Sequence, residues 1–351
     1  MQRFPAFFLA FSPVWPYNRN NIDMENYRKR KEDAADMKLV IIEPLGVDKE
    51  QLLSMAADAL PADLEIVYYD TRVTDTETLI ERGKDADIIA VSNLPLNADV
   101  IHGCKKLKML SVAFTGIDHI AMDACREQGV LVSNCAGYST VAVADLVFGM
   151  IIALYRNLIP CDQAVRKEGT KDGLVGFELE GKKIGIIGTG AIGLRVASIA
   201  RAFGCEVLAY SRTIKNIEGI RYVSMDELLS SCDIISLHTP LTPATRGLIG
   251  KDELTKMKSS AILINTARGP VVDSTALADA LNEGRIAGAG IDVFENEPPI
   301  ASEHPLLHAR HVIATPHVAF ATREALFKRA VIVFDNVAKW LDGTPQNVIR
   351  N

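Results

Sequence analysis

Three glycines with the spacing G-x-G-x-x-G lie in the middle of the chain, at Gly188, Gly190 and Gly193. A short β-branched apolar run precedes them, and apolar residues at helical spacing follow, at Leu194, Val196, Ala197, Ile199 and Ala200. Ala191 and Ile192, at the start of this helix, are expected at the cofactor. Gly188 permits a tight turn, Gly190 lets the backbone approach a pyrophosphate, and Gly193 lets the helix lie close to the strand. The N-terminus of that helix offers free N–H groups to phosphates. A lone glycine motif would be weak evidence. A strand, this turn and a helix in that order predict a dinucleotide site.

The end of the next predicted strand, Glu206–Tyr210, bears on which dinucleotide binds. Sites that prefer NAD usually place an acid there to hold the ribose 2′-hydroxyl. Here Ser211 and Arg212 follow the strand, and neither is a carboxylate. Because a hydroxyl and a guanidinium could accommodate a 2′-phosphate, the sequence favours NADP(H) over NAD(H) and leaves NAD(H) as the alternative.

Two further side chains that can do chemistry follow predicted strands. Arg268 comes after the strand Ala261–Ile264, and His317 follows Val312–Ala314 and Pro316. Ligands of open α/β sheets bind at the carboxyl ends of strands. A guanidinium can hold a carboxylate, and an imidazole can give or take a proton near neutral pH. Spacing alone leaves open that the arginine lies in a surface turn and that the histidine is a buried structural one.

Composition limits the class of protein. The chain has 351 residues, of which 48% are hydrophobic and 23% charged, as in an ordinary globular protein with room for two domains. Its formal net charge of −6 argues against a nucleic-acid or anionic-membrane role. The six cysteines lie far apart and form no C-x-x-C pair. We therefore expect reduced thiols in a cytoplasmic protein and no metal site.

The N-terminus differs from the rest of the chain. Residues 1–36 hold an aromatic stretch broken by prolines, FPAFFLAFSPVWP, and then the charged run YRKRKEDAAD. The apolar run is short for a targeting or membrane segment, so we expect a disordered extension, or a start codon assigned too early, since Met37 begins a clean strand. The apolar stretch Val141–Tyr155 is too short to span a bilayer and carries Asp145, which indicates a buried helix.

Short apolar strands alternate with amphipathic segments from Met37 onward, and this order predicts parallel sheets in an α/β fold. Asp273 is a suitable N-cap for one of the helices, and Gly284 is its expected C′ residue. The remaining predicted strands are Leu39–Ile42, Ile66–Tyr69, Ile88–Val91, Met109–Val112, Val130–Ser133, Ile184–Ile187, Ile234–Leu237 and Ala289–Val293. The predicted helices are Lys49–Leu60, Thr76–Arg82, Val141–Arg156, Ser274–Asn282 and Thr322–Leu341.

From Met37 to its end, the chain resembles the D-isomer-specific 2-hydroxyacid dehydrogenase family. The resemblance rests on the glycine turn and on VAFTGIDHIAMDACREQGVLVSN (112–134), LHTPLTPATRGLI (237–249), INTARGPVVDSTAL (264–277), GAGIDVFENEPP (288–299) and ATPHVAF (314–320). It implies two doubly wound parallel-sheet (Rossmann-like) domains with an active-site cleft between them. The substrate-binding domain would be residues 37–138 plus 321–351, and the NAD(P)-binding domain would be residues 139–320. A homodimer is also implied, with Val141–Tyr155 as one candidate contact.

The resemblance further implies an oxidoreductase that transfers a hydride between a nicotinamide cofactor, NAD(P)H, and a small D-2-hydroxy acid or 2-keto acid. Arg268 would bind the substrate carboxylate, and His317 would donate or accept the proton. Glu297, which directly precedes a proline, would orient the imidazole and favour its charged form; the family pattern selects it over Glu295. Glyoxylate, hydroxypyruvate or pyruvate suit the expected substrate loops better than a phosphorylated acid, because those loops have few basic side chains.

Other site residues follow from the same resemblance. Asp292 would accept a hydrogen bond from the nicotinamide carboxamide, and backbone N–H groups of two loops would meet the substrate. The remaining residues expected at the cofactor are Thr239, Pro240, Thr245 and Ala267, and those expected at the substrate are Asn93, Leu94, Thr115 and Gly116.

Two relatives of this scaffold offer alternatives. A corepressor family that senses nucleotides keeps the same arginine, glutamate and histidine, so these residues do not exclude a binding protein. Formate dehydrogenase is disfavoured, because that relative has glutamine where Glu297 stands.

Overall fold

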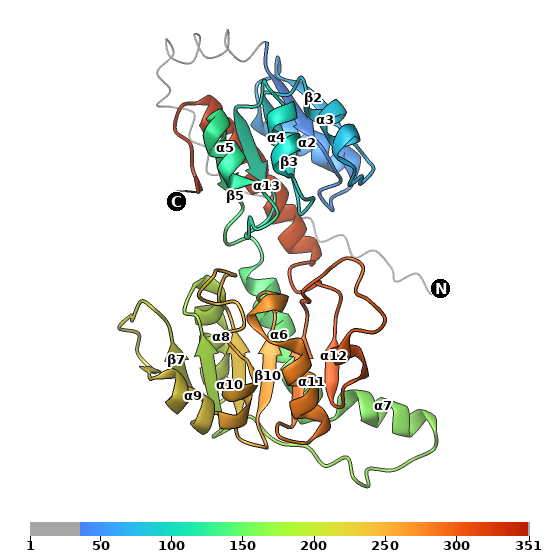
Figure 1. Cartoon of the computed structure of the whole chain (residues 1–351), viewed down its shortest axis with the longest axis vertical. Helices are drawn as coiled ribbons and strands as arrows, with labels where there is room; N and C mark the ends of the chain where they lie inside the picture. Colours follow the sequence, from blue (N-terminus) through green and yellow to red (C-terminus); the bar gives the residue numbers. More distant parts are fainter. Residues whose placement is uncertain (1–35, 350–351) are drawn as a thin grey trace.

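The structure is a computed structural model that describes residues 36–349. The expectation of a disordered extension over residues 1–36 falls, apart from Asp36, outside the described residues. Parallel strands alternate with helices through the described chain and form two units, one above the other in Figure 1. The strands are β1 (Lys38–Ile41), β2 (Glu65–Tyr68), β3 (Ile88–Val91), β4 (Met109–Val112), β5 (Leu131–Asn134), β6 (Lys183–Ile187), β7 (Glu206–Tyr210), β8 (Ile220–Tyr222), β9 (Ile234–Leu237), β10 (Ile262–Asn265), β11 (Gly288–Ile291) and β12 (Val312–Ala314). The α-helices are α2 (Lys49–Ala59), α3 (Thr76–Gly83), α4 (Ala98–Gly103), α5 (Met122–Gln128), α6 (Thr140–Tyr155), α7 (Leu158–Arg166), α8 (Ala191–Ala202), α9 (Met225–Ser231), α10 (Lys251–Lys256), α11 (Ser274–Asn282), α12 (Pro305–His308) and α13 (Arg323–Leu341).

The first sheet is parallel, with strand order β2-β1-β3-β4-β5. Its side chains alternate between two cores, as the pleat requires. Leu39 and Ile41 face a core shared with α2 and α13, whereas Val40 and Ile42 face a core shared with α3, α4 and α5. Helices therefore cover both faces, as expected for a doubly wound sheet.

The second sheet is also parallel and has the strand order β12-β11-β10-β9-β6-β7-β8. Helices α6 and α8 pack on one face, and α9, α10 and α11 pack on the other. The order reverses between β6 and β9, so the carboxyl ends of these two strands mark the place where such sheets bind ligands. The glycine turn lies there, between β6 and α8.

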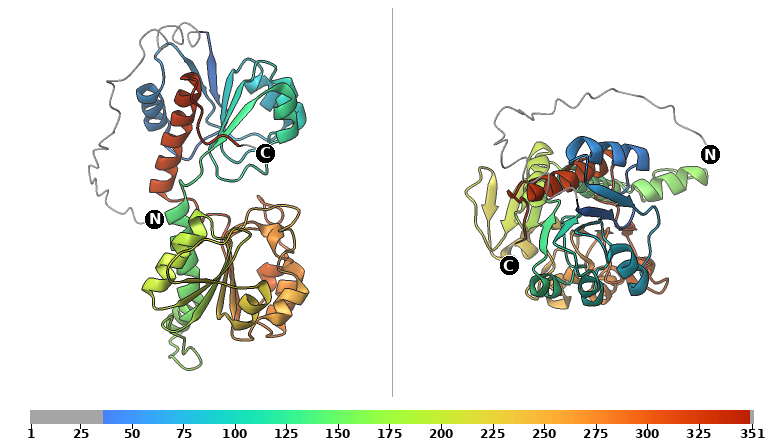
Figure 2. Two further views of the ribbon diagram at one scale, coloured as in Figure 1. Left: turned by 90° about the vertical axis from the view of Figure 1, so that its left-hand side faces the viewer. Right: turned by 90° about the horizontal axis from the view of Figure 1, so that it is seen from above.

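Two long helices connect the units. Helix α6 leads from the first unit into the second, and eight of its residues are buried, in agreement with the prediction of a buried helix. Helix α13 returns the chain to the first unit, where it lies beside α2 (Figures 1 and 2). This return is compatible with a substrate domain made of residues 37–138 plus 321–351, although the boundaries at 138 and 320 remain a prediction.

No single helix within residues 36–349 has the length and apolar character to cross a membrane. Helices α6 and α7 meet that criterion only as a pair, and they are bent by 56° relative to each other.

The predicted strands occur within two residues of their expected ends, but several short elements were not predicted. These are β8, α4, α5, α7, α9, α10 and α12. Each spans nine residues or fewer, too short for a hydrophobic period to stand out from the neighbouring loops.

The close approach of α8 to the β6 turn can be tested at Gly193. A Cβ there would lie 2.0 Å from the Gly188 carbonyl oxygen, so we expect Gly193→Ala to destabilise the fold by about 1–3 kcal/mol. Gly149→Ala in α6 is the matched control, because a Cβ there has no atom within 4 Å. Thermal denaturation should show a lower melting temperature for Gly193→Ala only. An unchanged melting temperature in that variant would contradict the close approach.

Candidate active site

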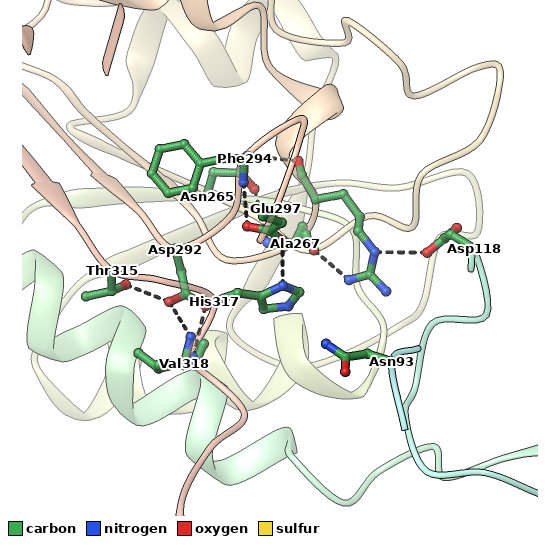
Figure 3. Close-up of polar contacts among 12 residues, drawn as sticks. Asn93, Asp118, Asn265, Ala267, Asp292, Phe294, Glu297, Thr315, His317 and Val318 are labelled. Atoms are coloured by element: carbon green, nitrogen blue, oxygen red, sulfur yellow. Dashed lines mark hydrogen bonds and ion pairs between the residues drawn. The ribbon is translucent and has the colours of Figure 1, made fainter. Parts of the chain in front are cut away.

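A histidine and a glutamate form a close pair at the edge of the second sheet (Figure 3). His317 Nδ1 lies 2.5 Å from Glu297 Oε1, and both side chains are largely buried. The other oxygen, Oε2, accepts a hydrogen bond from the Phe294 N–H at 3.0 Å, which fixes the carboxylate. Because Nδ1 faces the carboxylate, Nε2 is the ring atom left to meet a ligand. Glu295 pairs instead with His304, at 2.9 Å.

The turn that carries His317 is held by Asp292, which follows β11. The buried carboxylate of Asp292 accepts hydrogen bonds from Thr315 Oγ1, the Val318 N–H and the Ala319 N–H, at 2.6, 2.8 and 2.9 Å. Burial raises the pKa of Asp292. A carboxylate has about four acceptor positions, so these three bonds leave room for the predicted carboxamide contact. These bonds also give Asp292 a role that the sequence did not reveal. Asp292 holds His317 in a left-handed backbone conformation, with φ 52°.

Aromatic rings enclose the imidazole. The rings of Phe114 and Phe320 meet His317 edge-on, with centroid distances of 5.8 and 5.6 Å, and they contact each other at 4.9 Å. Phe114 follows β4, so the first unit supplies one wall around a histidine of the second. Apolar rings reduce the access of water to the imidazole.

Arg268 reaches across the junction between the two units. Its Nη1 donates to the Ala267 carbonyl at 2.7 Å, and its Nε donates to Asp118 Oδ2 at 2.9 Å. Its Nη2 lies so near the backbone of Gly116 that a Cβ there would be 1.6 Å away. Asn265 fixes the start of this turn by accepting from the Ala267 N–H at 3.0 Å and donating to the Arg268 carbonyl at 2.9 Å.

One loop of the first unit, residues 114–118, therefore contacts both the imidazole of His317 and the guanidinium of Arg268. Phe114 packs on His317, whereas Gly116 and Asp118 meet Arg268. The five residues from 114 to 118 span a short stretch of backbone, so the guanidinium and the imidazole border the same space. Asp118 was not predicted, although it lies within the quoted stretch TGIDHI beside Gly116.

The glycine turn fits a dinucleotide. Gly188 adopts φ 99°, and a Cβ on it would lie 2.5 Å from the His238 carbonyl oxygen. A Cβ on Gly190 would meet nothing within 4 Å, so this backbone is open to a ligand. Helix α8 begins at Ala191, followed by Ile192, without a side-chain cap, which leaves its first N–H groups available to a phosphate.

The neighbouring strand ends support this fit. The hydroxyl oxygens of Thr239 and Thr266 are buried and have no hydrogen-bond partner among the described residues. Buried polar atoms normally have partners, so a bound cofactor would satisfy these two. Thr239 follows β9 and Thr266 follows β10, directly before Ala267, and these two strands are neighbours next to β6 and its glycine turn.

Thr245 has a structural part in this region. Its Oγ1 donates to the Pro240 carbonyl at 2.6 Å and accepts from the Thr242 N–H at 2.8 Å. The hydroxyl thus holds the loop after β9, and its predicted cofactor contact remains a prediction.

Ser211 and Arg212 follow β7, and Arg212 is exposed. A second cation, Lys215, reaches the glycine turn, where its Nζ donates to the Thr189 carbonyl at 2.8 Å. The sequence did not single out Lys215, because the strand pattern ends before it.

The predicted substrate loops lie at the carboxyl ends of β3 and β4. Thr115 and Gly116 follow β4, and Gly116 borders Arg268 as described above. Leu94 differs from the prediction, because its N–H donates to the buried Glu43 Oε1 at 2.9 Å and the side chain is fully buried. Asn93, the residue before it, accepts hydrogen bonds from Arg72 through Oδ1 and its backbone carbonyl, and its predicted substrate contact remains a prediction.

Two other histidines, His238 and His119, are deeply buried. Burial lowers the pKa of His238 to about 3 and that of His119 to about 4. Both are therefore neutral near pH 7, which makes them poor proton donors there.

Comparisons with known proteins agree with this geometry. The family described as "D-isomer specific 2-hydroxyacid dehydrogenase, NAD binding domain" matches residues 148–319. The chain is 35% identical over 326 residues to hydroxypyruvate reductase from Blautia hydrogenotrophica, covering 90% of this chain and 100% of that protein. It is 36% identical over 324 residues to glyoxylate reductase from Aeropyrum pernix, covering 86% of this chain and 96% of that protein.

A solved structure has the same fold. An acyclic imino acid reductase (Bsp5), in complex with NADPH and D-Arg, matches with a TM-score of 0.81 at 32% identity, covering 90% of this chain and 100% of that chain. Sequence and structure together thus confirm the resemblance: this chain belongs to the D-isomer-specific 2-hydroxyacid dehydrogenase family, whose members are oxidoreductases that act on CH–OH groups.

Proposed function

We propose that this protein reduces a small 2-keto acid, such as glyoxylate or hydroxypyruvate, to the D-2-hydroxy acid with NAD(P)H. The observation that best supports this is the placement of Arg268 and His317 around one loop of the opposite unit. The names of the two curated relatives also favour a reductase over the corepressor-like alternative. An arginine for a carboxylate and a paired histidine for a proton are the groups that this chemistry needs.

When bound, the nicotinamide supplies or accepts the hydride. The guanidinium of Arg268 holds the substrate carboxylate and stabilises negative charge that develops on the neighbouring oxygen. His317 Nε2 donates a proton to that oxygen during reduction and takes it back during oxidation. Glu297, 2.5 Å from Nδ1, stabilises the imidazolium and holds the ring in place. Phe114 and Phe320 limit competition from water.

A panel of small 2-keto acids tests the activity. With at least one of these acids, the wild type should oxidise NAD(P)H rapidly and with saturation. In His317→Ala, kcat/KM for that acid should be lower by about 10²–10⁴-fold. Arg268→Ala should show a comparable loss, while nucleotide binding, followed by the fluorescence of the reduced cofactor, is retained in both variants. The exposed Arg310→Ala serves as control. Turnover near that of the wild type in either site variant would refute its assigned role.

The Glu297–His317 pair can be tested by removing the charge of the glutamate while keeping its shape. Glu297→Gln cannot balance positive charge on the imidazole, so kcat/KM for reduction should fall by about tenfold or more. Binding of the reduced cofactor should be unchanged. A kcat/KM close to that of the wild type would remove Glu297 from the proton relay.

We propose NADP(H) as the preferred cofactor. Arg212 and Lys215 place two cations near the end of β7 and the glycine turn, and the solved relative binds NADPH. Arg212→Asp should therefore move the ratio of kcat/KM for NADPH over NADH toward NADH by about tenfold or more. A wild-type enzyme with the higher kcat/KM for NADH would contradict this preference.

We also propose a cytoplasmic homodimer. All six cysteines are free and five are buried, as is usual in a reducing compartment. Helix α6, one candidate contact, has half of its residues buried, whereas α7 projects from the body of the second unit (Figure 1). No residue of α7 is buried, and Leu158, Ile159 and Val165 are exposed. Beside it lies a cavity of about 360 Å³ lined by α6, α7 and Phe177, which an apolar side chain of a second copy could fill.

Light scattering after size-exclusion chromatography should give the mass of two chains. Ile159→Asp should lower the mass toward that of one chain, because a charge in a dimer contact is costly. Ile214→Asp, which is also exposed but lies in the loop after β7, is the control and should leave the mass unchanged. A wild-type mass of one chain would contradict the dimer.

A further inference from the structure

The guanidinium of Arg268 already holds a carboxylate, and that carboxylate belongs to the chain itself. Its Nε donates to Asp118 Oδ2 at 2.9 Å, and within residues 36–349 this is the one ion pair that Asp118 forms. Figure 3 shows the Asp118 carboxylate joined to the guanidinium by a dashed line. The pair connects the two units, because Asp118 lies in the loop after β4 and Arg268 follows β10. The group proposed to bind the substrate carboxylate therefore has a carboxylate on it before a ligand arrives.

The surroundings of the guanidinium leave its Nε edge as the place for a carboxylate. Its Nη1 donates to the Ala267 carbonyl at 2.7 Å. A Cβ on Gly116 would lie 1.6 Å from Nη2 and 2.9 Å from Cζ, so the backbone of Gly116 closes the space beyond Nη2. A carboxylate does fit at the Nε edge, because that of Asp118 is bound there. A ligand carboxylate that uses this edge must displace Asp118.

Of the two members of the pair, Asp118 is the one that is free to move. The turn that carries Arg268 is fixed, because Asn265 bonds to the Ala267 N–H and to the Arg268 carbonyl. The side chain of Asp118 is 44% exposed, whereas that of Arg268 is 25% exposed. Ion pairs at such exposed positions are weak, because water can hydrate the carboxylate that leaves. Asp118 can therefore rotate into solvent while the guanidinium stays in place.

The other charged side chains on this side of the cleft have partners of their own. The guanidinium of Arg72 pairs with the buried Glu43, and that of the buried Arg329 donates to Ser92 Oγ at 3.1 Å. His119 adds no positive charge near pH 7, because burial lowers its pKa to about 4. These groups remain when the aspartate of the pair is changed. A substitution of that aspartate therefore alters the charge at this one contact.

We propose that Asp118 is an internal competitor of the substrate, which holds the Nε edge of Arg268 in the empty site and leaves it when a ligand carboxylate binds. The assignment rests on the proposed function, in which Arg268 binds the substrate carboxylate. One carboxylate replaces another in this exchange, so the guanidinium is never left without an anion. The observed affinity for the acid is the intrinsic affinity multiplied by the fraction of molecules in which Asp118 has released Arg268. Asp118 thereby determines how tightly the site binds carboxylates.

Asp118→Asn tests the competition. The amide keeps an oxygen that can accept a hydrogen bond from Nε, but it lacks the charge that makes the aspartate a competitor. We expect KM for the best 2-keto acid to fall by about three- to tenfold, with a smaller change in kcat. Asp123→Asn is the matched control, because Asp123 is exposed, pairs with Arg126 on α5 and changes the net charge by the same amount. Its KM should equal that of the wild type.

Oxamate provides a readout that needs no turnover. It carries a carboxylate beside a carbonyl, as a 2-keto acid does, but its amide is not reduced. Isothermal titration calorimetry of the protein saturated with NADPH should show a dissociation constant for oxamate that is about three- to tenfold lower in Asp118→Asn than in the wild type. Arg268→Ala should bind oxamate far more weakly. Partial unfolding cannot produce a gain in affinity, so the gain reports on the contact itself.

The outcomes separate this inference from the proposed function. A wild type that reduces none of the 2-keto acids would refute the proposed function itself. Wild-type affinity for oxamate in Arg268→Ala would remove Arg268 from the carboxylate site, and with it the role of Asp118. Unchanged or weaker binding of the acid and of oxamate in Asp118→Asn would overturn the competition alone. An equal gain in Asp123→Asn would assign the effect to the net charge of the protein and would also overturn it.

Discussion

The carboxyl ends of parallel strands meet at one edge of a sheet. In both sheets of this chain, the site residues come directly after such strand ends. Arg268, Glu297 and His317 follow β10, β11 and β12 of the second sheet. Asn93 and Gly116 follow β3 and β4 of the first. Because the Arg268–Asp118 ion pair and the Phe114–His317 contact join the two units, these edges meet at one place. The position of every proposed site residue depends on this arrangement.

Close backbone approaches make the arrangement possible. At Gly193 the helix lies against the turn that follows β6, and at Gly116 the first unit lies against the guanidinium of Arg268. A side chain at either position would occupy space that a neighbouring group already fills. Gly193 is therefore required by packing against backbone, whereas a side chain at Gly116 would displace the guanidinium of Arg268, and Gly190 is open and suited to a ligand.

Buried carboxylates supply rigidity on both sides of the junction. Asp292 accepts three hydrogen bonds from the turn that carries His317, and Glu43 accepts two from the loop that carries Asn93. In both places a buried acid accepts hydrogen bonds from backbone N–H groups and so fixes the loop that carries a neighbouring side chain. Preorganisation of this kind lets a site hold its geometry without reorganising when the ligand arrives.

The sequence by itself determined the features that are local in the chain. The β6 strand, the glycine turn and the start of α8 could be recognised because their residues are neighbours and their roles depend on short spacing. Alternating apolar runs likewise gave the parallel α/β class and most strand positions, and the resemblance to a family gave Arg268, Glu297 and His317. Elements of a few residues, such as β8 and α12, carried too little periodic signal to be found.

Only the tertiary structure decided which remote residues meet. Asp118 and Arg268 are 150 residues apart in the sequence. Glu43 accepts hydrogen bonds from the N–H groups of Ser92 and Leu94, which are 49 and 51 residues away. No local pattern encodes such pairs, because each depends on the packing of whole strands and helices between its members. For that reason the engagement of the Leu94 N–H with Glu43, the orientation of the Asn93 amide by Arg72 and the aromatic walls around His317 became visible only once the two sheets were in place.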